Sequence, residues 1–294
     1  MTISFRELSN KFLAWSKLHQ APRSHEYYEG YIQKYLKYIG DKADEPASSM
    51  KPYQIEEWVD NGRKSNGKPW SDNYKRGGVV AINTVFNRCI KSGYIDINPI
   101  KTTHKPSARS RQTFATPADV EKILAHISPD DPFHDYVTFL WYSFVRPQEV
   151  RHIEARHVDL TSRQINFPAI ESKGKRHPRC ILIFNTTYPI IEKLVAKYPE
   201  GKIFRCTRGT AWTKYAVCAR FQELSIKIGK KITAYDLRHG IITAALEDGK
   251  NHMDVAAASG HVDGSMIGKC YSHVHANKDR VRNVFEGMIT LQQK

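Results

Sequence analysis

Apolar residues in the first hundred positions recur at helical spacing and predict a small helical domain. The clearest stripe lies on one face of a helix and consists of Tyr28, Tyr31, Ile32, Tyr35, Leu36 and Ile39. Ser24 is the candidate N-cap of this helix, and Gly40 is the candidate glycine at its end. Three more helices are predicted by Phe5, Leu8, Phe12 and Leu13, by Ile55, Trp58 and Val59, and over about residues 71–91 with Ile82, Phe86, Cys89 and Ile90 buried.

The helical pattern breaks at Asn98-Pro99, because proline disfavours the helical conformation of the residue before it. The segment Lys101–Gln112 then holds four Lys or Arg residues, no acid and no Phe, Trp or Tyr, which is typical of an exposed linker. We therefore expect a helical domain over residues 1–100, a basic linker over 101–115 and a second domain over 116–294.

The second domain is predicted to begin with a helix. Thr116-Pro117-Ala118-Asp119 combines a capping threonine, proline at the first helical position and an acid in the first turn. A long apolar helix is predicted over Tyr136–Val145, with Arg146 at its end, and a shorter helix over Gln148–Glu154.

A small sheet is predicted next. Gln164–Phe167 alternates polar and apolar residues, Arg179–Phe184 is rich in strand formers, and a basic turn (Glu171–His177) joins them. Helices follow again, and the last is predicted over about residues 277–291, with an apolar stripe of Val281, Val284, Phe285, Met288 and Ile289. The fold class is therefore mainly α with a small antiparallel β-sheet (α+β).

Charge narrows the class of partner. The chain carries a formal net charge of +15. Within Lys173–Lys231 there are 14 Lys or Arg residues against three acids. Such a run is either a solvated face or a surface that neutralises a phosphate backbone, and we expect a nucleic acid as the partner.

Hydropathy indicates a protein that stays where it is made. The mean hydropathy is −0.54, and the longest apolar stretch, Tyr136–Val145, is far shorter than the ~20 residues of a membrane-spanning helix. Polar residues occupy the N-terminus where a signal peptide would be apolar. We expect a cytoplasmic protein without a membrane partner.

Metal and nucleotide signatures are absent from the sequence. The five cysteines are odd in number and form no C-x-x-C pair, which argues against a disulfide framework and a closed zinc site of the cysteine type. No P-loop, H-E-x-x-H, G-x-S-x-G or dinucleotide-binding motif occurs.

Five residues of the second domain form a more specific pattern. They are Arg146 in SFVRPQEV, Lys173 in ESKGKRHP, Arg238 in TAYDLRHG, His261 in AASGHVDG and, ten residues later, Tyr271 in GKCYSHV. Their order and spacing resemble the tyrosine recombinases, also called phage integrases, over most of residues 116–290. The helical domain and the basic linker resemble the core-binding domain of that family less specifically.

The resemblance implies a mechanism of DNA cleavage and rejoining. Arg146 and Arg238 would bind the non-bridging oxygens of a scissile phosphodiester, because a guanidinium is always charged and forks onto phosphate oxygens. Tyr271 would attack the phosphorus and form a 3′-phosphotyrosyl bond. Lys173 would protonate the leaving 5′-oxygen, and His261 would hydrogen-bond the phosphate. No metal, ATP or other cofactor is implied.

The resemblance also implies an assembly. The partner is double-stranded DNA, clamped between the helical core-binding domain and the catalytic domain, and the working form is a homo-tetramer on two DNA sites. The last helix either docks on a neighbouring subunit or packs in its own core.

The sequence departs from the family pattern at one candidate site residue. The family usually has His-x-x-Arg where this chain has Tyr235-Asp236-Leu237-Arg238. A tyrosine keeps a hydrogen-bond donor but lacks an imidazole that titrates near neutral pH. Lys175 is the alternative to Lys173 as the general acid.

Two other functions stay open at this point. A type IB topoisomerase-like enzyme would nick and religate DNA with the same chemistry and no exchange of partners. A non-catalytic DNA-binding protein on a recombinase scaffold would explain Tyr235.

Overall fold

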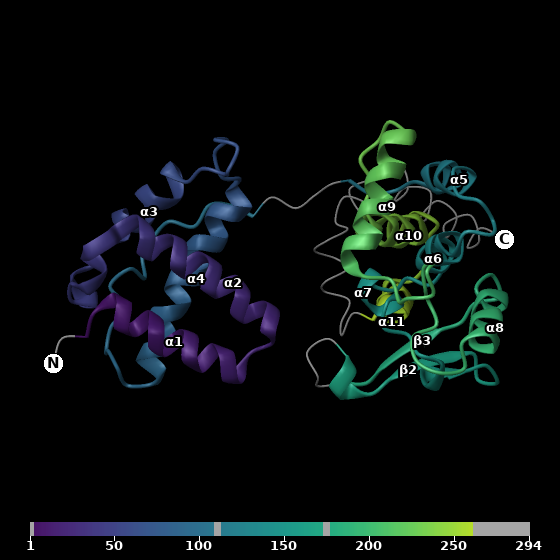
Figure 1. The fold of residues 1–294 in the computed structure, drawn as a ribbon, viewed down its shortest axis with the longest axis horizontal. Helices are drawn as coiled ribbons and strands as arrows, with labels where there is room; N and C mark the ends of the chain where they lie inside the picture. The colour runs from purple at the N-terminus through teal and green to yellow at the C-terminus, as the bar shows by residue number, and fades with distance from the viewer. Residues whose placement is uncertain (1–2, 109–112, 173–176, 261–294) are drawn as a thin grey trace, which may run out of the picture. The chain divides into compact units, whose positions relative to one another are not determined.

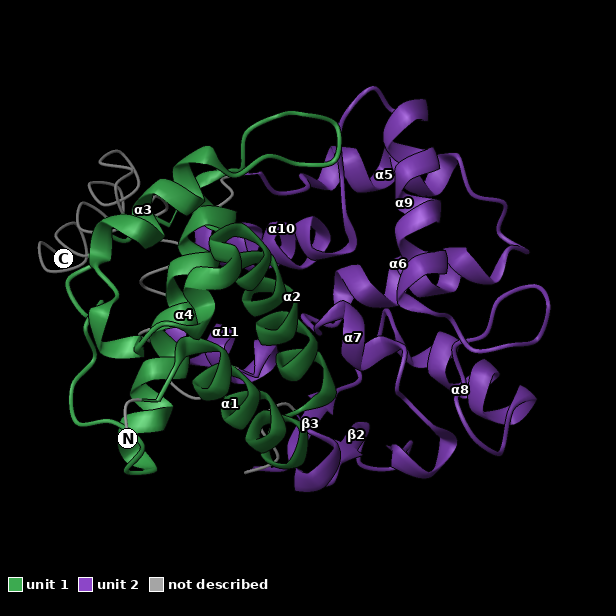
Figure 2. Ribbon diagram, turned by 60° about the vertical axis from the view of Figure 1, so that its left-hand side comes forward, with its two compact units in different colours: residues 1–111 green, residues 112–294 purple. Residues whose placement is uncertain are grey.

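The structure, a computed structural model, describes residues 3–108, 113–172 and 177–260 (Figure 1). The chain divides into two compact units, residues 1–111 and 112–294, which Figure 2 colours separately. The four helices predicted for the first part of the chain are present in unit 1: α1 (Phe5–His19), α2 (Pro22–Ile39), α3 (Pro52–Asn61) and α4 (Asp72–Lys91).

Helix α2 shows how closely the pattern predicts the core of unit 1. Four residues of its predicted stripe are buried there: Tyr31, Ile32, Tyr35 and Leu36. The helix ends at Gly40, as predicted, where a φ of +59° suits glycine. The prediction of Ser24 as the N-cap is wrong, because Pro22 takes the first helical position and Ala21 is the N-cap.

The segment after α4 packs against the rest of unit 1. The side-chain amide of Asn98 donates to Asn87 Oδ1 (2.9 Å), and Thr103 is buried with 4% of its surface exposed. Arg76 Nη1 donates to the carbonyl oxygen of Pro106 (3.1 Å). The chain therefore stays in contact with unit 1 for several residues within the segment that has the composition of an exposed linker.

Unit 2 combines helices with one small sheet. None of the helices in the described ranges of the chain is long and apolar enough to cross a membrane. The elements of unit 2 are α5 (Pro117–Ala125), α6 (Pro132–Tyr142), α7 (Pro147–Val150), β1 (Val158–Asp159), β2 (Gln164–Phe167), β3 (Arg179–Leu182), α8 (Tyr188–Lys197), α9 (Lys214–Lys227), α10 (Ala234–Glu247) and α11 (His252–Ser259).

The sheet is antiparallel with the order β1-β2-β3. Ile165 of β2 lies opposite Ile181 of β3, and both side chains are buried. The structure confirms the strand predicted as β2 and ends β3 at Leu182, two residues before the predicted end at Phe184. Strand β1 is only two residues long, too short to produce an alternating pattern. The predicted fold class, mainly helical with a small antiparallel sheet, is confirmed.

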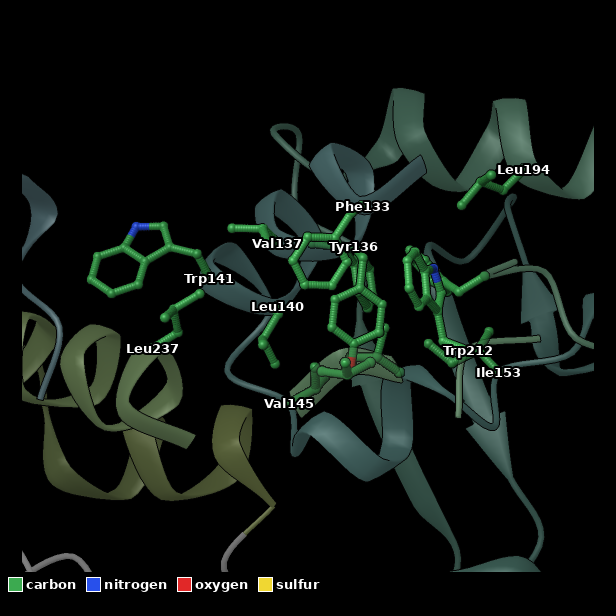
Figure 3. Packing of buried hydrophobic residues seen from close by; sticks show 14 of the residues in the cluster. Phe133, Tyr136, Val137, Leu140, Trp141, Val145, Ile153, Leu194, Trp212 and Leu237 are labelled. Carbon is green, nitrogen blue, oxygen red and sulfur yellow. The ribbon is translucent and has the colours of Figure 1, made fainter. Parts of the chain in front are cut away.

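The core of unit 2 is built around α6 (Figure 3). The rings of Phe133 and Tyr136 stack with centroids 5.5 Å apart, and Trp212 packs 5.0 Å from Phe133. The Tyr136 hydroxyl donates to the carbonyl oxygen of Pro147 (3.0 Å). A buried hydroxyl needs such a partner, and this bond ties α6 to the start of α7.

Helix α5 begins as the sequence predicts. Thr116 Oγ1 accepts the Asp119 N–H (3.2 Å), and the Asp119 carboxylate accepts the Thr116 N–H (2.8 Å), which together form a capping box. The neighbouring Ala115 N–H donates to the carbonyl oxygen of Asp236 (2.9 Å). The start of α5 is thereby joined to α10, the helix that carries Tyr235 and Arg238.

The turn between α6 and α7 differs from the prediction. Helix α6 ends at Tyr142 instead of Val145, and Phe144 has a φ of +56°. Pro147 holds the residue before it in the extended region, so Arg146 is the N-cap of α7 and not the end of the long helix. The helix predicted over Gln148–Glu154 is reduced to the four residues of α7.

Candidate active site

The candidate residues divide into two groups. The described part of unit 2 contains three of them: Arg146, Tyr235 and Arg238. The others lie outside the described residues: Lys173, its alternative Lys175, His261 and Tyr271. The described group forms an arginine-rich site at the end of α11.

Arg146 is held by its own helix start. Its backbone N–H donates to Glu149 Oε2 (2.8 Å), and its Nη1 donates to Glu149 Oε1 (2.9 Å). Its Nη2 donates to the carbonyl oxygen of Gly260 (3.1 Å). The side chains of Arg146 and Glu149 are mostly buried, with 19% and 14% of their surfaces exposed. Salt therefore screens the ion pair between them less than it screens a surface pair. The guanidinium therefore has one defined orientation.

Arg238 lies in the first turns of α10 and is buried, with 4% of its surface exposed. Its Nη1 donates to the carbonyl oxygen of Phe144 (2.7 Å), and its Nη2 donates to that of Ser259 (2.8 Å). The positive φ of Phe144 thus belongs to the turn whose carbonyl meets this guanidinium. Arg238 links the turn before Arg146 to the end of α11.

A third arginine, Arg179, occupies the start of β3. Its Nη2 donates to the carbonyl oxygen of Ala258 (3.0 Å), and its Nη1 to that of Cys180 (2.6 Å). Its Nε lies 3.6 Å from Glu149 Oε1. Burial lowers the pKa of Arg179, and the charge of Arg146 lowers it further, whereas Glu149 opposes the shift. An arginine titrates so far above neutral pH that the group stays charged.

Three consecutive backbone carbonyls, those of residues 258–260, each accept a hydrogen bond from a different arginine. The last carbonyls of a helix lack partners within the helix and carry partial negative charge, so cationic donors stabilise them. Gly260 ends α11 with a φ of +67°, and residue 261 follows it in the chain. The arginines therefore converge on the backbone that leads to His261.

Two of these arginines and the candidate tyrosine share one hollow. Its volume is about 360 Å³, and its lining includes Arg146, Glu149, Ser172, Arg179 and Tyr235. Tyr235 is half exposed. The guanidinium of Arg146, fixed at the wall of this hollow, is suited to bind an oxyanion such as a phosphate, whereas Arg238 does not line the hollow. In the described ranges, no three His, Cys, Asp or Glu side chains are grouped to hold a metal ion.

A second cluster of charges surrounds the start of the turn that is predicted to carry Lys173. Arg156 Nη2 donates to both carboxylate oxygens of Glu171 (2.9 and 3.1 Å), and its Nε donates to Glu154 Oε2 (2.7 Å). His157 Nε2 lies 3.1 Å from Glu171 Oε2. The hydrogen bond from Arg156 lowers the pKa of Glu171, and burial lowers that of His157. Glu154 and Glu171 also line the hollow, and the positive charge of Arg156 balances part of their negative charge.

Two residues of this site do not stand out in the sequence motif. Glu149 stands three residues after Arg146, the spacing of a capping box, and that spacing is a usable signal for it. Arg179 gives no such signal, because it is one of many basic residues in its part of the chain and begins an ordinary strand. Only the tertiary structure separates it from its basic neighbours.

Comparison with protein families identifies the class of protein. The model of the phage integrase family matches residues 113–278, more than half of the chain, and the chain belongs to this family. The resemblance drawn from the order and spacing of five residues is thereby confirmed. No curated protein matches the sequence.

Solved structures with a similar fold include other integrases. The Tn1549 transposon integrase in complex with transposon right end DNA has a TM-score of 0.75 and 17% identity, covering 98% of this chain and 100% of that chain. A lambda integrase dimer bound to a COC′ core site has a TM-score of 0.74 and 13% identity, covering 92% of this chain and 95% of that chain. At these identities the likeness establishes the fold.

Proposed function

We propose that the protein is a site-specific DNA recombinase that cuts and rejoins DNA through a 3′-phosphotyrosyl intermediate. The observation that carries the proposal is the convergence of Arg146 and Arg238 at the end of α11, directly before His261, in a chain of the phage integrase family. Two integrases of similar fold are bound to DNA in their own structures, which supports duplex DNA as the partner.

The arginines account for the binding of the scissile phosphate. Each guanidinium presents donors that match two phosphate oxygens, and both are already oriented by protein acceptors. Attack on the phosphorus adds negative charge to the non-bridging oxygens. Fixed cations therefore stabilise the transition state more than the ground state.

The chemical step would use three residues outside the described ranges. The Tyr271 oxygen attacks the phosphorus while the bond from phosphorus to the 5′-oxygen breaks. Lys173, or Lys175 in its place, gives a proton to the leaving 5′-oxygen. A phenol has a pKa of ~10, and positive charge beside it would favour the phenolate that Tyr271 needs. His261 donates a hydrogen bond to the phosphate, and attack by a 5′-hydroxyl from the partner strand reverses the step.

Tyr235 would serve as a hydrogen-bond donor at the hollow, where the family usually has a histidine. It is half exposed and lines the hollow with Arg146. A phenolic hydroxyl can bond a phosphate oxygen, but it does not exchange protons near neutral pH as an imidazole does. We propose that Tyr235 binds the phosphate without acting as an acid or base.

The roles of the two units follow from the same proposal. Unit 1 would serve as the expected core-binding domain (residues 1–100), and unit 2 as the expected catalytic domain (residues 116–294). The two would hold duplex DNA between them, joined by the basic segment 101–115. The working form would be a homo-tetramer on two DNA sites in the cytoplasm.

Covalent capture tests the proposal. The protein is expressed with DNA and denatured, and the DNA attached to protein is isolated and sequenced. We expect an adduct for the wild type and for Tyr235→Phe, and none for Tyr271→Phe. The matched tyrosine control separates loss of the nucleophile from loss of any hydroxyl near the site. Intact DNA binding with no wild-type adduct would instead indicate a non-catalytic DNA-binding protein.

A further inference from the structure

We propose that Arg179 is a positioning residue of this active site. It would hold the end of α11 and, through Glu149, the guanidinium of Arg146 in the geometry that binds the scissile phosphate. The inference rests on the proposed function. It adds a residue that neither the motif spacing nor the family comparison singles out.

The contacts of Arg179 reach three separate elements. Its guanidinium is bonded to the carbonyls of Cys180 in its own strand and Ala258 in α11, and it faces Glu149 of α7. Only 11% of its side chain is exposed. Its buried Nε has no hydrogen-bond partner among the described residues, so its contact with Glu149 is an ion pair at 3.6 Å. Arg179 therefore fixes the sheet, α7 and α11 against one another.

The fit between Arg179 and Gly260 is close. A Cβ added to Gly260 would lie 2.5 Å from Arg179 Cζ and 2.6 Å from its Nε, closer than real Cβ atoms approach other atoms. The guanidinium thus lies against the backbone at the point where α11 ends. The backbone carbonyl of Gly260 accepts the hydrogen bond from Arg146. A shift of Arg179 would therefore move a hydrogen-bond acceptor of Arg146, together with the backbone that leads to His261.

Charge gives Arg179 a second effect on Arg146. The Glu149 carboxylate lies between the two guanidinium groups, with its Oε1 2.9 Å from Arg146 Nη1 and 3.6 Å from Arg179 Nε. With both arginines present, one acid is shared by two cations and the group keeps a net positive charge. Without Arg179, Glu149 would neutralise Arg146 alone and compete with the phosphate for it.

The motif positions separate Arg179 from the two phosphate ligands of the proposal, since the terminal nitrogens of Arg238 also donate to backbone carbonyls. Both terminal nitrogens of Arg179 donate to backbone carbonyls, and its Nε faces a carboxylate. It acts through Arg146 and the end of α11 and makes no direct bond to the phosphate. Loss of Arg179 should then slow the chemical step and leave the affinity for DNA nearly unchanged.

The test compares Arg179→Lys with Arg205→Lys. Arg205 is the matched control, because it also donates to two backbone carbonyls (Lys202 and Glu200) and does not line the hollow. The full-length protein is mixed with a duplex of the sequence recovered by covalent capture. The rate of adduct formation at saturating DNA and the DNA concentration for half-saturation are measured separately.

We expect Arg179→Lys to lower the saturating rate at least about tenfold while the half-saturating concentration changes less than about threefold. Arg205→Lys should keep the wild-type rate. The variant Arg146→Lys tests whether Arg179 acts through Arg146 or only stabilises the fold. Adding Arg179→Lys to it should slow the reaction less than about threefold more, because both changes disturb the same guanidinium.

Two results would overturn the inference. One is a wild-type rate for Arg179→Lys. The other is a double variant whose loss equals the product of the two single losses, which would mean that Arg179 acts independently of Arg146. Absence of any adduct from the wild type would instead refute the proposed function, so the two failures are distinguishable.

Discussion

Replacing Gly260 with alanine perturbs the packing between the end of α11 and Arg179. An alanine Cβ at this position would lie 2.5 Å from Arg179 Cζ and 2.7 Å from its Nη1. The guanidinium would have to move, and it is held at the carbonyl of Ala258 (3.0 Å) and beside Glu149. Gly260 also has a φ of +67°, a conformation that alanine adopts at a cost.

The magnitude follows from these two costs. Alanine in the left-handed region costs about 1–2 kcal/mol. Displacing Arg179 breaks its charge-assisted hydrogen bond to the part-buried carbonyl of Ala258, which costs about 1–3 kcal/mol. Gly260→Ala should therefore lower the free energy of unfolding by about 2–5 kcal/mol. Gly229 is a matched control, since its φ is +66° and nothing lies within 4 Å of an added Cβ. Gly229→Ala should cost only the backbone part, about 1–2 kcal/mol.

The assay is urea-induced unfolding of the full-length protein, followed by far-ultraviolet circular dichroism. Both glycines belong to unit 2, so the same transition is compared in the two variants. The difference between them isolates the contact with Arg179 and should be about 1–3 kcal/mol. Equal losses in the two variants would refute the reasoning, because the steric contact would then contribute nothing.

Three further predictions concern single residues. Arg238→Lys should slow adduct formation about 10²–10³-fold, because a single ammonium group cannot donate to both the Phe144 and the Ser259 carbonyls as the guanidinium does. A near-normal rate would contradict this prediction. Burial and then the charge of Arg156 keep the pKa of His157 below its ordinary ~6.5. As the pH falls, the imidazole is therefore protonated more readily in the unfolded chain than in the folded one. The free energy of unfolding decreases as the pH drops below about 6.5. His157→Gln should lose less stability than the wild type between about pH 7.5 and about pH 5.5, and equal losses would refute the assignment. Tyr235→His should make the rate of adduct formation depend on pH around pH ~6.5, while the free energy of unfolding stays within about 0.5 kcal/mol of the wild type. An unchanged pH profile would count against a place for residue 235 at the phosphate.

Local signals predict most of the helices and strands of this fold. The stripe of α2 and the capping box at Thr116 are periodic or short-range patterns, and both are found in the structure. The errors occur where one residue overrides the local pattern. Pro22 takes the helix start from Ser24, and the positive φ of Phe144 ends α6 before its apolar run ends.

The candidate site was predictable only in part. Arg146 and Arg238 follow from the order and spacing of the motif, and the structure brings them to the same end of α11. Arg179 could not be found in this way, because its role depends on three elements that meet only in the folded chain. The roles of the residues outside the described ranges, Tyr271 among them, stay predictions.

The most direct test of the central claim is to identify the amino acid that carries DNA. The covalent adduct is trimmed with nucleases, digested with a protease and sequenced by mass spectrometry, and the free DNA end is labelled to determine its chemistry. The account predicts a nucleotide joined through its 3′-phosphate to Tyr271, and a free 5′-hydroxyl on the other strand end. A nucleotide on any other residue, or a linkage through a 5′-phosphate, would contradict it.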